Sequence, residues 1–510
     1  MTKPNLQGVP VLVVGAGIMG AGIAQVAAQA GHKVFLFDLR EGAAAAAKAK
    51  LAATFDALVA KGRLEPDAAQ AALARIEPVA SLQAAATAGL AVEAIVENLD
   101  AKRSLFKQLE ALLGSEAVLA TNTSSISVTA IANGLEHPGR LVGMHFFNPV
   151  PLMKLVEVVS GLQTLPAVAE AIFELATTWG KVPVHAKSTP GFIVNRIARP
   201  YYAETLALLL EQAATPQVLD TCLKAAGFRM GPCELMDLIG HDTNFAVTNS
   251  VFGANFYDKR YMPSLVQREM VDGGLLGRKT GQGFYRYEGG AALGGPLTAE
   301  AQAAPATARQ VTVHGSGPIA DHLEQAATAA LAPQGWGPAR EPESAWTGLA
   351  IDDARLVLTD GRSAQQLAAA LGAADVAVFD HPLVQPVLPA TALAYAVAPG
   401  ASEAWRAQAA AWLAALGFAP LPVADAPGLV VARTVAMLVN EAADAVLQGV
   451  CDPAGADAAM KLGLNYPAGP FEWLARWSVE GVVGVIEALD AEYRGERYRV
   501  SPWLRRRLQG

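Results

Sequence analysis

The sequence predicts an α/β Rossmann-like domain and an all-α domain, followed by a truncated Rossmann-like remnant and a second all-α domain. Two observations predict the first pair. Short runs of Val, Ile and Leu alternate with helical patterns up to residue 186, and helical patterns then continue alone to about residue 274. A third observation predicts the second pair, because several Gly and Pro positions of the first half recur at one constant offset in the second half.

The elements of the first domain follow one another as in a mostly parallel sheet. A buried strand at Val11–Val14 leads through a glycine turn into a helix, and Val34–Phe37 forms the next strand, ending at Asp38. Further apolar runs, separated by helical patterns, predict four more strands: Leu90–Val96, Val118–Ala120, Leu141–Phe147 and Leu155–Val159. Helices on both faces of the sheet are therefore expected.

Turn clusters and composition predict the domain boundaries. The turn Lys187-Ser-Thr-Pro-Gly191 ends the first domain, and residues 289–306 are Gly, Ala and Pro without periodicity, as in a linker. We therefore predict a Rossmann-like domain at 1–186, a helical domain at 187–288, a linker at 289–306, a truncated Rossmann-like domain at 307–424 and a second helical domain at 425–510.

Composition excludes several functional classes. The net charge of −8 argues against a nucleic-acid partner, which would require a basic face. No run of about 20 apolar residues is present, and no charged segment precedes a cleavable apolar one, so we expect neither membrane insertion nor secretion. The three cysteines (Cys222, Cys233 and Cys451) have no metal-ligand spacing, so we expect a reducing compartment and no metal site. The Ala-rich, Lys-poor composition suggests the cytoplasm of a bacterium.

Gly15-Ala-Gly17-Ile-Met-Gly20 follows a strand and opens a helix, and Asp38 ends the strand that comes after this helix. In a dinucleotide-binding turn, Gly15 permits the tight bend, Gly17 lets the backbone approach the pyrophosphate, and Gly20 lets helix and strand pack closely. Asp38 would bind the adenosine ribose and repel a 2′-phosphate. NAD is therefore the predicted cofactor, although Arg40 is a basic neighbour that could bind a phosphate.

A second set of polar residues predicts the chemistry. His145 lies at the end of one predicted strand, and Glu157 lies inside the next Val-rich strand, where a carboxylate is costly without a partner. The pair would act as a general base that takes the hydroxyl proton when a carbinol is oxidised. Ser124 and Asn195 can hydrogen-bond the substrate oxygens. A lone histidine is more often an ordinary core residue, but the dinucleotide turn and Glu157 favour the base.

Several motifs resemble those of the 3-hydroxyacyl-CoA dehydrogenase family over residues 9–287. They are Val-Glu-Asn-Leu around Glu97, Asn-Thr-Ser-Ser at 122–125, His-Phe-Phe-Asn-Pro-Val-Pro-Leu-Met-Lys-Leu-Val-Glu at 145–157, Thr-Pro-Gly-Phe-Ile-Val-Asn-Arg at 189–196, Met-Gly-Pro-Cys-Glu-Leu-Met-Asp at 230–237 and Arg-Lys-Thr-Gly-Gln-Gly-Phe-Tyr at 278–285. The resemblance implies NAD-dependent oxidation of a (3S)-3-hydroxyacyl-CoA to the 3-ketoacyl-CoA, with a helical domain that dimerises and closes over the substrate.

The resemblance also assigns residue roles. It makes His145 the catalytic base and Glu157 its partner, and it places Ser124 and Asn195 against the substrate. Five residues fall on family positions near the NAD ribose and nicotinamide: Glu97, Lys102, Asn122, Asn148 and Lys279. Thr54 and Lys61 fall where the family contacts CoA. Thr54 replaces a more usual Ser, and Lys61 is equally well interpreted as an ordinary exposed lysine.

The second copy departs from this pattern. Pro190-Gly191, Arg196 and Glu204 recur at Pro427-Gly428, Arg433 and Glu441, but the same offset takes Glu157 to Ala394 and Asn195 to Ala432. His381 lies one residue from the expected position of His145 and has no carboxylate partner there. The glycine turn recurs at a larger offset, at Gly315, so the second Rossmann-like part is shortened. We predict a non-catalytic remnant, and an intramolecular pseudo-dimer in which residues 425–510 cover the apolar face of the first helical domain.

Other functions stay open at this point. A dehydrogenase of free hydroxy acids shares the family's motifs, and a structural NAD-binding protein could keep the fold without the activity. A bifunctional enzyme with a hydratase would need a separate domain, which the dehydrogenase-like second half does not provide. The two-copy length resembles 3-hydroxyadipyl-CoA dehydrogenases of phenylacetate degradation and some 3-hydroxybutyryl-CoA dehydrogenases. The sequence fixes neither the acyl chain nor any association of whole chains.

Overall fold

The computed structural model describes residues 3–294, 297, 308–384 and 386–509. The chain forms two compact units: residues 1–196 with 445–464, and residues 197–444 with 465–510. Among the residues described, no helix has the length and apolar character needed to cross a bilayer.

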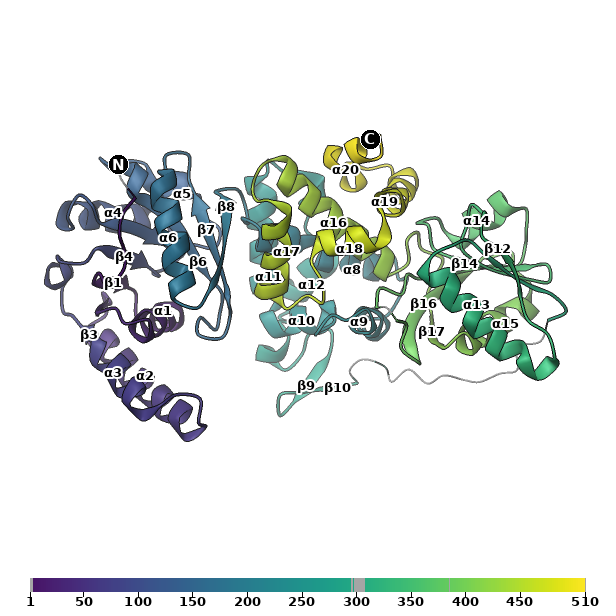
Figure 1. Cartoon of the computed structure of the whole chain (residues 1–510), viewed down its shortest axis with the longest axis horizontal. Coiled ribbons are helices and arrows are strands. Elements are labelled where there is room, and N and C mark those ends of the chain that lie inside the picture. The colour runs from purple at the N-terminus through teal and green to yellow at the C-terminus, as the bar shows by residue number, and fades with distance from the viewer. Residues whose placement is uncertain (1–2, 295–296, 298–307, 385, 510) are drawn as a thin grey trace. The chain divides into compact units, whose positions relative to one another are not determined.

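The first unit is built on an eight-stranded sheet in the order β3-β2-β1-β4-β5-β6-β7-β8 (Figure 1). All neighbouring strands are parallel except β6 and β7, which are antiparallel. The chain order reverses between β1 and β4, which is where sheets of this kind bind ligands at the carboxyl ends of their strands. The strands are β1 (Val11–Val14), β2 (Val34–Phe37), β3 (Ile76–Pro78), β4 (Leu90–Glu93), β5 (Val118–Thr121), β6 (Leu141–Phe146), β7 (Leu155–Ser160) and β8 (Val182–Lys187).

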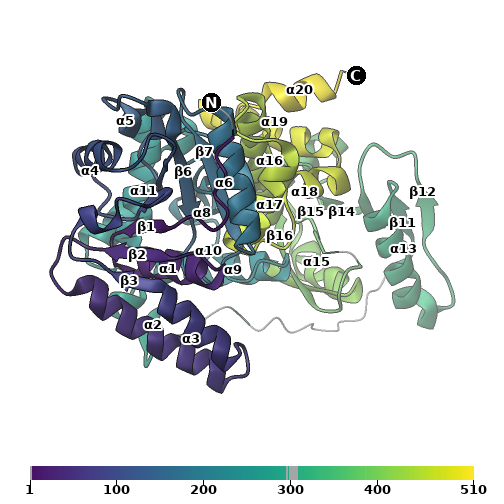
Figure 2. The same ribbon diagram turned by 60° about the vertical axis from the view of Figure 1, so that its left-hand side comes forward.

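Helices complete the first unit. The core joins buried strand residues to apolar faces of α1 (Ile18–Gln29) and α6 (Pro166–Thr178). Helix α4 (Leu99–Leu112) follows β4 and is strongly amphipathic. Helices α2 (Ala43–Ala60) and α3 (Pro66–Arg75) pack side by side as a hairpin (Figures 1 and 2). The prediction of a Rossmann-like first domain is confirmed.

The second unit contains the helical regions and a smaller sheet. The first helical region comprises α8 (Arg199–Leu210), α9 (Pro216–Ala225), α10 (Pro232–Ile239), α11 (His241–Ala254) and α12 (Leu265–Asp272). The later helices are α16 (Val431–Leu447), α18 (Pro470–Trp477), α19 (Val479–Tyr493) and α20 (Pro502–Arg507). Of the predicted linker, Ala291–Leu293 form β10, paired antiparallel with β9 (Arg286–Glu288), whereas residues 295–296 and 298–306 lie outside the described residues.

The smaller sheet has seven strands in the order β12-β11-β13-β14-β15-β16-β17. Its pairing is mixed, with β11–β13, β13–β14 and β15–β16 antiparallel. Helices α13 (Pro318–Leu331) and α15 (Glu403–Ala415) pack on it (Figure 1). The predicted truncated Rossmann-like domain is confirmed. Its strands are β11 (Val311–His314), β12 (Ala339–Glu341), β13 (Gly348–Ile351), β14 (Ala354–Leu358), β15 (Val376–Phe379), β16 (Thr391–Val397) and β17 (Phe418–Pro422).

Two buried carboxylates in the second unit repeat one arrangement of partners. Glu204 accepts hydrogen bonds from Arg497 (3.0 Å) and the Tyr498 hydroxyl (3.1 Å). Glu441, its equivalent in the second copy, accepts bonds from Arg260 (3.3 Å) and the Tyr261 hydroxyl (2.5 Å). Since the same offset relates Arg260-Tyr261 to Arg497-Tyr498, each copy contributes the carboxylate to one cluster and the Arg-Tyr pair to the other.

Candidate active site

The glycine turn after β1 has the geometry of a dinucleotide-binding turn. Gly15 has a φ of +104°, and a Cβ there would lie 2.3 Å from the Ala94 carbonyl oxygen. A Cβ on Gly20 would lie 1.8 Å from the Gly15 carbonyl oxygen, so helix and turn touch only because Gly20 has no side chain. A Cβ on Gly17 would meet nothing within 4 Å, and Gly17 precedes the first residue of α1. The open side of Gly17 therefore leaves the helix N-terminus accessible to an anion such as a pyrophosphate.

Asp38 lies at the end of β2 beside this turn. Its carboxylate accepts the Ala16 N–H (2.8 Å) and both the backbone N–H and the Nε–H of Arg40 (2.9 and 3.1 Å). Burial raises the pKa of Asp38, but the bonds from Arg40 and Ala16 outweigh it, and the net direction is downward. A cavity of about 650 Å³ opens beside Asp38, Gly15 and Gly17, a volume within the usual range of ligand sites. The ionised carboxylate and the open turn fit the ribose and pyrophosphate of NAD.

Glu97 connects the ends of β4 and β5. Its Oε1 accepts hydrogen bonds from the Thr123 hydroxyl (2.6 Å) and the Ser124 N–H (2.9 Å), and its Oε2 lies 3.2 Å from Lys102 Nζ. Burial raises the pKa of Glu97, but Lys102, Thr123 and Ser124 together lower it to about 2. The three predicted site residues Glu97, Lys102 and Ser124 therefore form one cluster. Ser125 also donates to Glu97, from its N–H and its hydroxyl (both 3.1 Å).

His145 and Glu157 form the buried pair that the sequence predicts. They are directly opposite one another on antiparallel strands β6 and β7, and His145 Nδ1 lies 2.5 Å from Glu157 Oε2. Glu157 is fully buried, and its Oε1 accepts the N–H groups of Ile193 and Val194 (3.0 Å each). Because these two donors fix the carboxylate, its remaining oxygen is held against the imidazole.

The predicted asparagines stand around the strand ends. Asn122 Oδ1 accepts the Phe146 N–H (2.9 Å), which ties the segment after β5 to the end of β6. Asn148 is exposed in the loop after β6, where its peptide bond to Pro149 is cis. Asn195 lies on the short helix α7 (Val194–Ile197), directly after the two residues whose N–H groups bind Glu157. The structure therefore places Asn195 next to the support of the His–Glu pair.

Three predicted ligand residues have other contacts. Thr54 is exposed on α2 and its hydroxyl donates to the Lys50 carbonyl oxygen (3.0 Å). Lys61 is exposed directly after the same helix. Lys279 belongs to the second unit, where it pairs with Asp242. These contacts leave the proposed ligand roles of all three residues untested.

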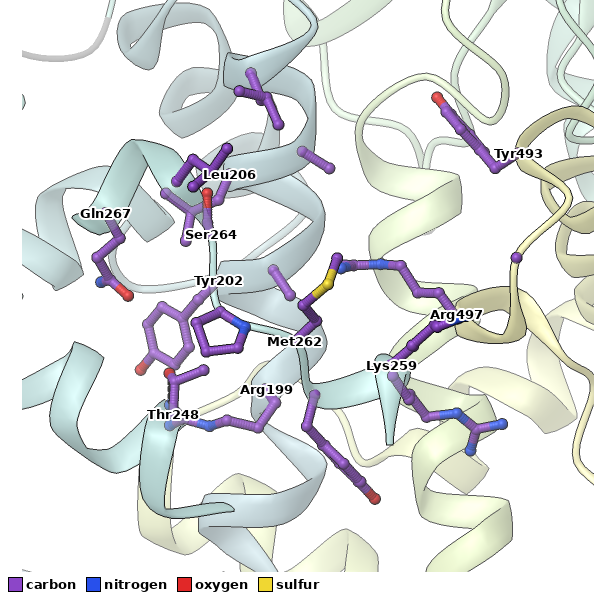
Figure 3. Close-up of a pocket in the computed structure, with 18 of the residues that line it drawn as sticks. Arg199, Tyr202, Leu206, Thr248, Lys259, Met262, Ser264, Gln267, Tyr493 and Arg497 are labelled. Carbon is purple, nitrogen blue, oxygen red and sulfur yellow. Dashed lines mark hydrogen bonds between the residues drawn. The ribbon is translucent and has the colours of Figure 1, made fainter. Parts of the chain in front are cut away.

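A cavity of about 530 Å³ lies in the second unit, between α8 and the segment around residues 493–498 (Figure 3). Tyr202, Leu206 and Met262 contribute apolar surface to it, and Arg497 on its wall pairs with Glu204. No predicted site residue lines this cavity.

The equivalent positions of the second copy carry polar residues. Ala203 and Ala207 line the cavity, and the offset between the copies takes them to Asn440 and Asp444. Asn440 bonds the Arg499 carbonyl and the Ser501 N–H, and Asp444 bonds Arg260. The cavity is therefore lined by alanines at two positions where the second copy has hydrogen-bonded polar side chains.

Among the described residues, the second copy has no equivalent of the His–Glu pair. Asp380, not His381, lies opposite Ala394, since the Asp380 N–H donates to the Ala394 carbonyl oxygen (2.9 Å). Asp380 is fully buried, and its carboxylate accepts the N–H groups of Val430 (2.9 Å), Val431 (2.6 Å) and Ala432 (2.9 Å). It therefore binds the residues equivalent to those that Glu157 binds in the first copy. His381 packs on Trp477, with ring centroids 4.4 Å apart, and burial lowers its pKa to about 4.

Sequence reasoning missed two supporting groups. Glu93 is fully buried at the end of β4 and binds Lys102 Nζ (2.6 Å) and the Thr121 hydroxyl (2.7 Å). It therefore fixes the ammonium group that also pairs with Glu97. A carboxylate in a Val-rich strand was the signal that identified Glu157, and it applies equally to Glu93. Lys181 donates to the carbonyls of Val150 and Met153 in the loop after β6, and burial lowers its pKa to about 8. Nothing in the sequence around Lys181 indicates this role.

The fold and the dinucleotide turn define an NAD-binding oxidoreductase. The model of the 3-hydroxyacyl-CoA dehydrogenase NAD-binding domain matches residues 10–189, and that of the family's C-terminal domain matches residues 191–287 and again 428–509. The 3-hydroxybutyryl-CoA dehydrogenase reduced Rossmann-fold domain matches residues 356–427. The chain belongs to the 3-hydroxyacyl-CoA dehydrogenase family and is an NAD-dependent dehydrogenase, as the motifs predict.

Similar proteins extend this match over the whole chain. It is 43% identical to the 3-hydroxyadipyl-CoA dehydrogenase of Escherichia coli over 498 residues, which are 98% of this chain and 97% of that protein. A crystal structure of 3-hydroxybutyryl-CoA dehydrogenase from Escherichia coli matches 99% of both chains, with a TM-score of 0.87 and 41% identity. The (S)-3-hydroxybutyryl-CoA dehydrogenase of Ralstonia eutropha matches 55% of this chain and 99% of its own, with a TM-score of 0.53 and 40% identity. The two-copy organisation is therefore shared with the full-length relatives.

Proposed function

We propose that the chain oxidises (3S)-3-hydroxyacyl-CoA to 3-ketoacyl-CoA with His145 as the general base. The 2.5 Å contact between His145 Nδ1 and Glu157 Oε2 carries this proposal. With the carboxylate accepting the Nδ1 proton, Nε2 is left unprotonated and can take the proton of the substrate hydroxyl. Bound NAD supplies the acceptor for the hydride that leaves C3. Ser124 and Asn195 hydrogen-bond the substrate oxygens.

Glu157 has a second role in the proposed mechanism. When the imidazole becomes positively charged, the adjacent carboxylate stabilises that charge in a buried setting where solvent screens it little. The bonds from Ile193 and Val194 hold the carboxylate before substrate arrives, so no rearrangement is needed as the charge develops.

The cofactor roles of individual residues belong to the same proposal. Gly17 would leave room for the pyrophosphate at the start of α1, with Gly15 and Gly20 shaping the turn, and Asp38 would bind the adenosine ribose. Five further residues contact the ribose and nicotinamide: Glu97, Lys102, Asn122, Asn148 and Lys279. The cluster that joins Glu97, Lys102 and Ser124 supports the first two of these, because it fixes a carboxylate beside the strand ends.

We propose that the acyl substrate is 3-hydroxyadipyl-CoA and that the enzyme acts in phenylacetate catabolism. In this proposal Thr54 and Lys61 contact CoA. The Escherichia coli relative that matches over nearly its whole length carries that substrate in its name. The alternative is 3-hydroxybutyryl-CoA, since the similar Escherichia coli structure is named for that activity. A third candidate class is free hydroxy acids, which would dispense with CoA.

Kinetics on the purified chain separate these alternatives. Initial rates of NAD reduction should be compared for 3-hydroxyadipyl-CoA, 3-hydroxybutyryl-CoA and free 3-hydroxybutyrate. A higher kcat/KM for the dicarboxylic thioester supports the proposal, and a higher value for 3-hydroxybutyryl-CoA replaces it with the alternative. Turnover of the free acid alone would overturn the acyl-CoA assignment. Near-wild-type turnover by His145→Gln would overturn the role of the base.

We also propose that the two helical regions form an intramolecular pseudo-dimer with one active site per chain. The exchange of Arg-Tyr pairs between Glu204 and Glu441 supports this, because a two-fold axis generates reciprocal contacts of this kind. Fragment 1–288 should therefore aggregate or dimerise through its uncovered helices. The full chain should bind one NAD. Two equivalent NAD sites, or a fully active monomeric fragment, would contradict the proposal.

A further inference from the structure

Helix α17 (Pro453–Leu464) comes from the copy that lacks the His–Glu pair, yet it belongs to the first unit. It packs on β7 and β8 of the large sheet. The turn before it is tied to the same region. The Lys187 N–H donates to the Val450 carbonyl (2.9 Å), and Arg196 Nη1 donates to Gln448 Oε1 (2.8 Å). The second copy therefore contributes a segment anchored beside the proposed catalytic pair.

Helix α17 lies very close to the sheet at Gly463. A Cβ on this residue would lie 2.8 Å from Leu155 Cδ2, 3.1 Å from Val194 Cγ2 and 3.7 Å from Phe147 Cε1. Leu155 and Val194 are buried, at 0% and 1% exposure, so neither side chain can move out into solvent to make room. A side chain at this position would therefore force Leu155 to shift within the core, which glycine avoids.

Each of these three neighbours shares a strand with, bonds to, or packs on one member of the His–Glu pair. Leu155 lies two residues before Glu157 on β7 and so points to the same face of the sheet. The N–H of Val194 donates to Glu157 Oε1 (3.0 Å). The Phe147 ring packs on the His145 ring with centroids 4.6 Å apart. A displacement at Gly463 would therefore be passed to Glu157 through β7 and the Val194 N–H, and to His145 through the Phe147 ring.

Glycine weakens a helix relative to alanine, so its presence near the end of α17 needs a structural reason. The equivalent helix of the first copy is α9, which packs on β16 in the second unit and ends at Ala225, with Ala226 as its C-cap. The strand it meets carries Ala394 in place of a catalytic carboxylate. The helix with the closely packed glycine is therefore the one that packs on the strand carrying Glu157.

We propose that Gly463 is a positioning residue and that α17, contributed by the catalytically silent copy, sets the geometry of the His145–Glu157 pair. The inference rests on the proposed function, because it requires this pair to act as the base. The second copy then does more than cover an apolar face, since it completes the support of the active site in the first copy.

Gly463→Ala tests the proposal, with Gly455→Ala as the matched control in the same helix. A Cβ at Gly455 would approach only the exposed Asp452 side chain closely, 2.9 Å from its Oδ1. We expect Gly463→Ala to lower kcat roughly 10-fold, since misplacement by about 1 Å can cost about 100-fold. The KM values for NAD and acyl-CoA should change less than about twofold, and the acidic limb of the kcat–pH profile should move, because the carboxylate contact to His145 is altered.

A compensating change separates positioning from general destabilisation. Leu155→Val removes the Cδ atoms that the new methyl would meet, so Gly463→Ala/Leu155→Val should recover most of the lost kcat and the original pH profile. A wild-type kcat and pH profile for folded Gly463→Ala, with or without a lower Tm, would overturn the proposal. If that variant does not fold, Val194→Ala removes the same contact from the other side and should also shift the acidic limb. An unshifted profile in Val194→Ala would then overturn it.

The same experiments distinguish this inference from the proposed function. If His145→Gln is inactive while Gly463→Ala behaves as wild type, only the positioning role fails. If His145→Gln retains activity, the base assignment itself fails.

Discussion

Glu157→Gln should separate the catalytic role of this carboxylate from its structural one. The glutamine oxygen can replace Glu157 Oε1 as the acceptor for the Ile193 and Val194 N–H groups, which lie 3.0 Å from it. The glutamine NH₂ then faces His145 Nδ1, where a carboxylate oxygen lies 2.5 Å away in the native protein. Because NH₂ can only donate there, Nδ1 must become the acceptor and the ring proton must move to Nε2. The nitrogen that should take the substrate proton is then already protonated.

The size of the effect follows from what is lost. Loss of general base catalysis lowers kcat by about 10²–10⁴-fold, or roughly 2.7–5.4 kcal/mol in activation free energy. Folding should change little, since both buried N–H groups keep an acceptor. Glu157→Ala removes that acceptor, and two unsatisfied buried donors at about 1–3 kcal/mol each should lower the free energy of unfolding by roughly 2–6 kcal/mol.

The assay is steady-state NADH formation with saturating NAD and acyl-CoA, combined with thermal unfolding of each variant. Asp380→Asn is the matched control, because Asp380 is also a buried carboxylate that accepts N–H groups at a helix start but lies opposite an alanine instead of a histidine. It should leave kcat unchanged. A Glu157→Gln enzyme within about threefold of the wild-type kcat would refute the tautomer argument, since base catalysis contributes at least about 100-fold.

Three further predictions concern other clusters. Asp38→Asn should lower the preference for NAD over NADP roughly 10-fold, because a negative charge near the 2′-phosphate is lost. The ratio of kcat/KM for the two cofactors measures this preference, and an unchanged ratio would assign cofactor choice to other residues. Glu97 has a folded pKa of about 2, below its ordinary value of 4.5, so its contribution to stability is present above pH 4.5 and is lost as the pH falls from there toward 2. Glu97→Gln should flatten the dependence of Tm on pH in that window, and a curve parallel to wild type would exclude this linkage. Glu204→Gln should lower the free energy of unfolding by about 3–5 kcal/mol, since it leaves Arg433 and Arg497 buried without their carboxylate. NAD affinity should not change. A denaturant unfolding curve identical to that of the wild type would contradict this prediction.

The first half of the fold could be predicted from local patterns because its signals are local. Buried parallel strands appear as short Val-rich runs, and the glycines of the turn stand where a Cβ would strike the backbone, as at Gly15 and Gly20. The pairing of His145 with Glu157 could be inferred because a carboxylate in an apolar strand requires a partner. Glu93 satisfies the same criterion and was missed, because its charged partner Lys102 lies on a helix and its partner on the neighbouring strand, Thr121, is uncharged.

The second copy shows why a constant offset is insufficient. The offset that takes Glu157 to Ala394 takes His145 to Pro382, whereas the residue that lies opposite Ala394 is Asp380. The connection between β15 and β16 is therefore two residues longer than that between β6 and β7, and an offset taken from the later motifs points past the equivalent residue toward His381. Insertions in a loop leave no periodic signal, so only the register of the strands reveals them.

The exchange of Glu157 for Asp380 also indicates what each copy was required to keep. In both copies a carboxylate lies near the start of a helix whose first N–H groups are in the protein interior, and buried N–H groups without an acceptor cost free energy. In the first copy, one oxygen of Glu157 serves these donors and the other serves His145. In the second copy, the carboxylate of Asp380 stands on the opposite strand and accepts the N–H groups of the helix. Ala394 occupies the position equivalent to Glu157. The N–H groups of the helix therefore account for a buried carboxylate in the second copy without any role in chemistry.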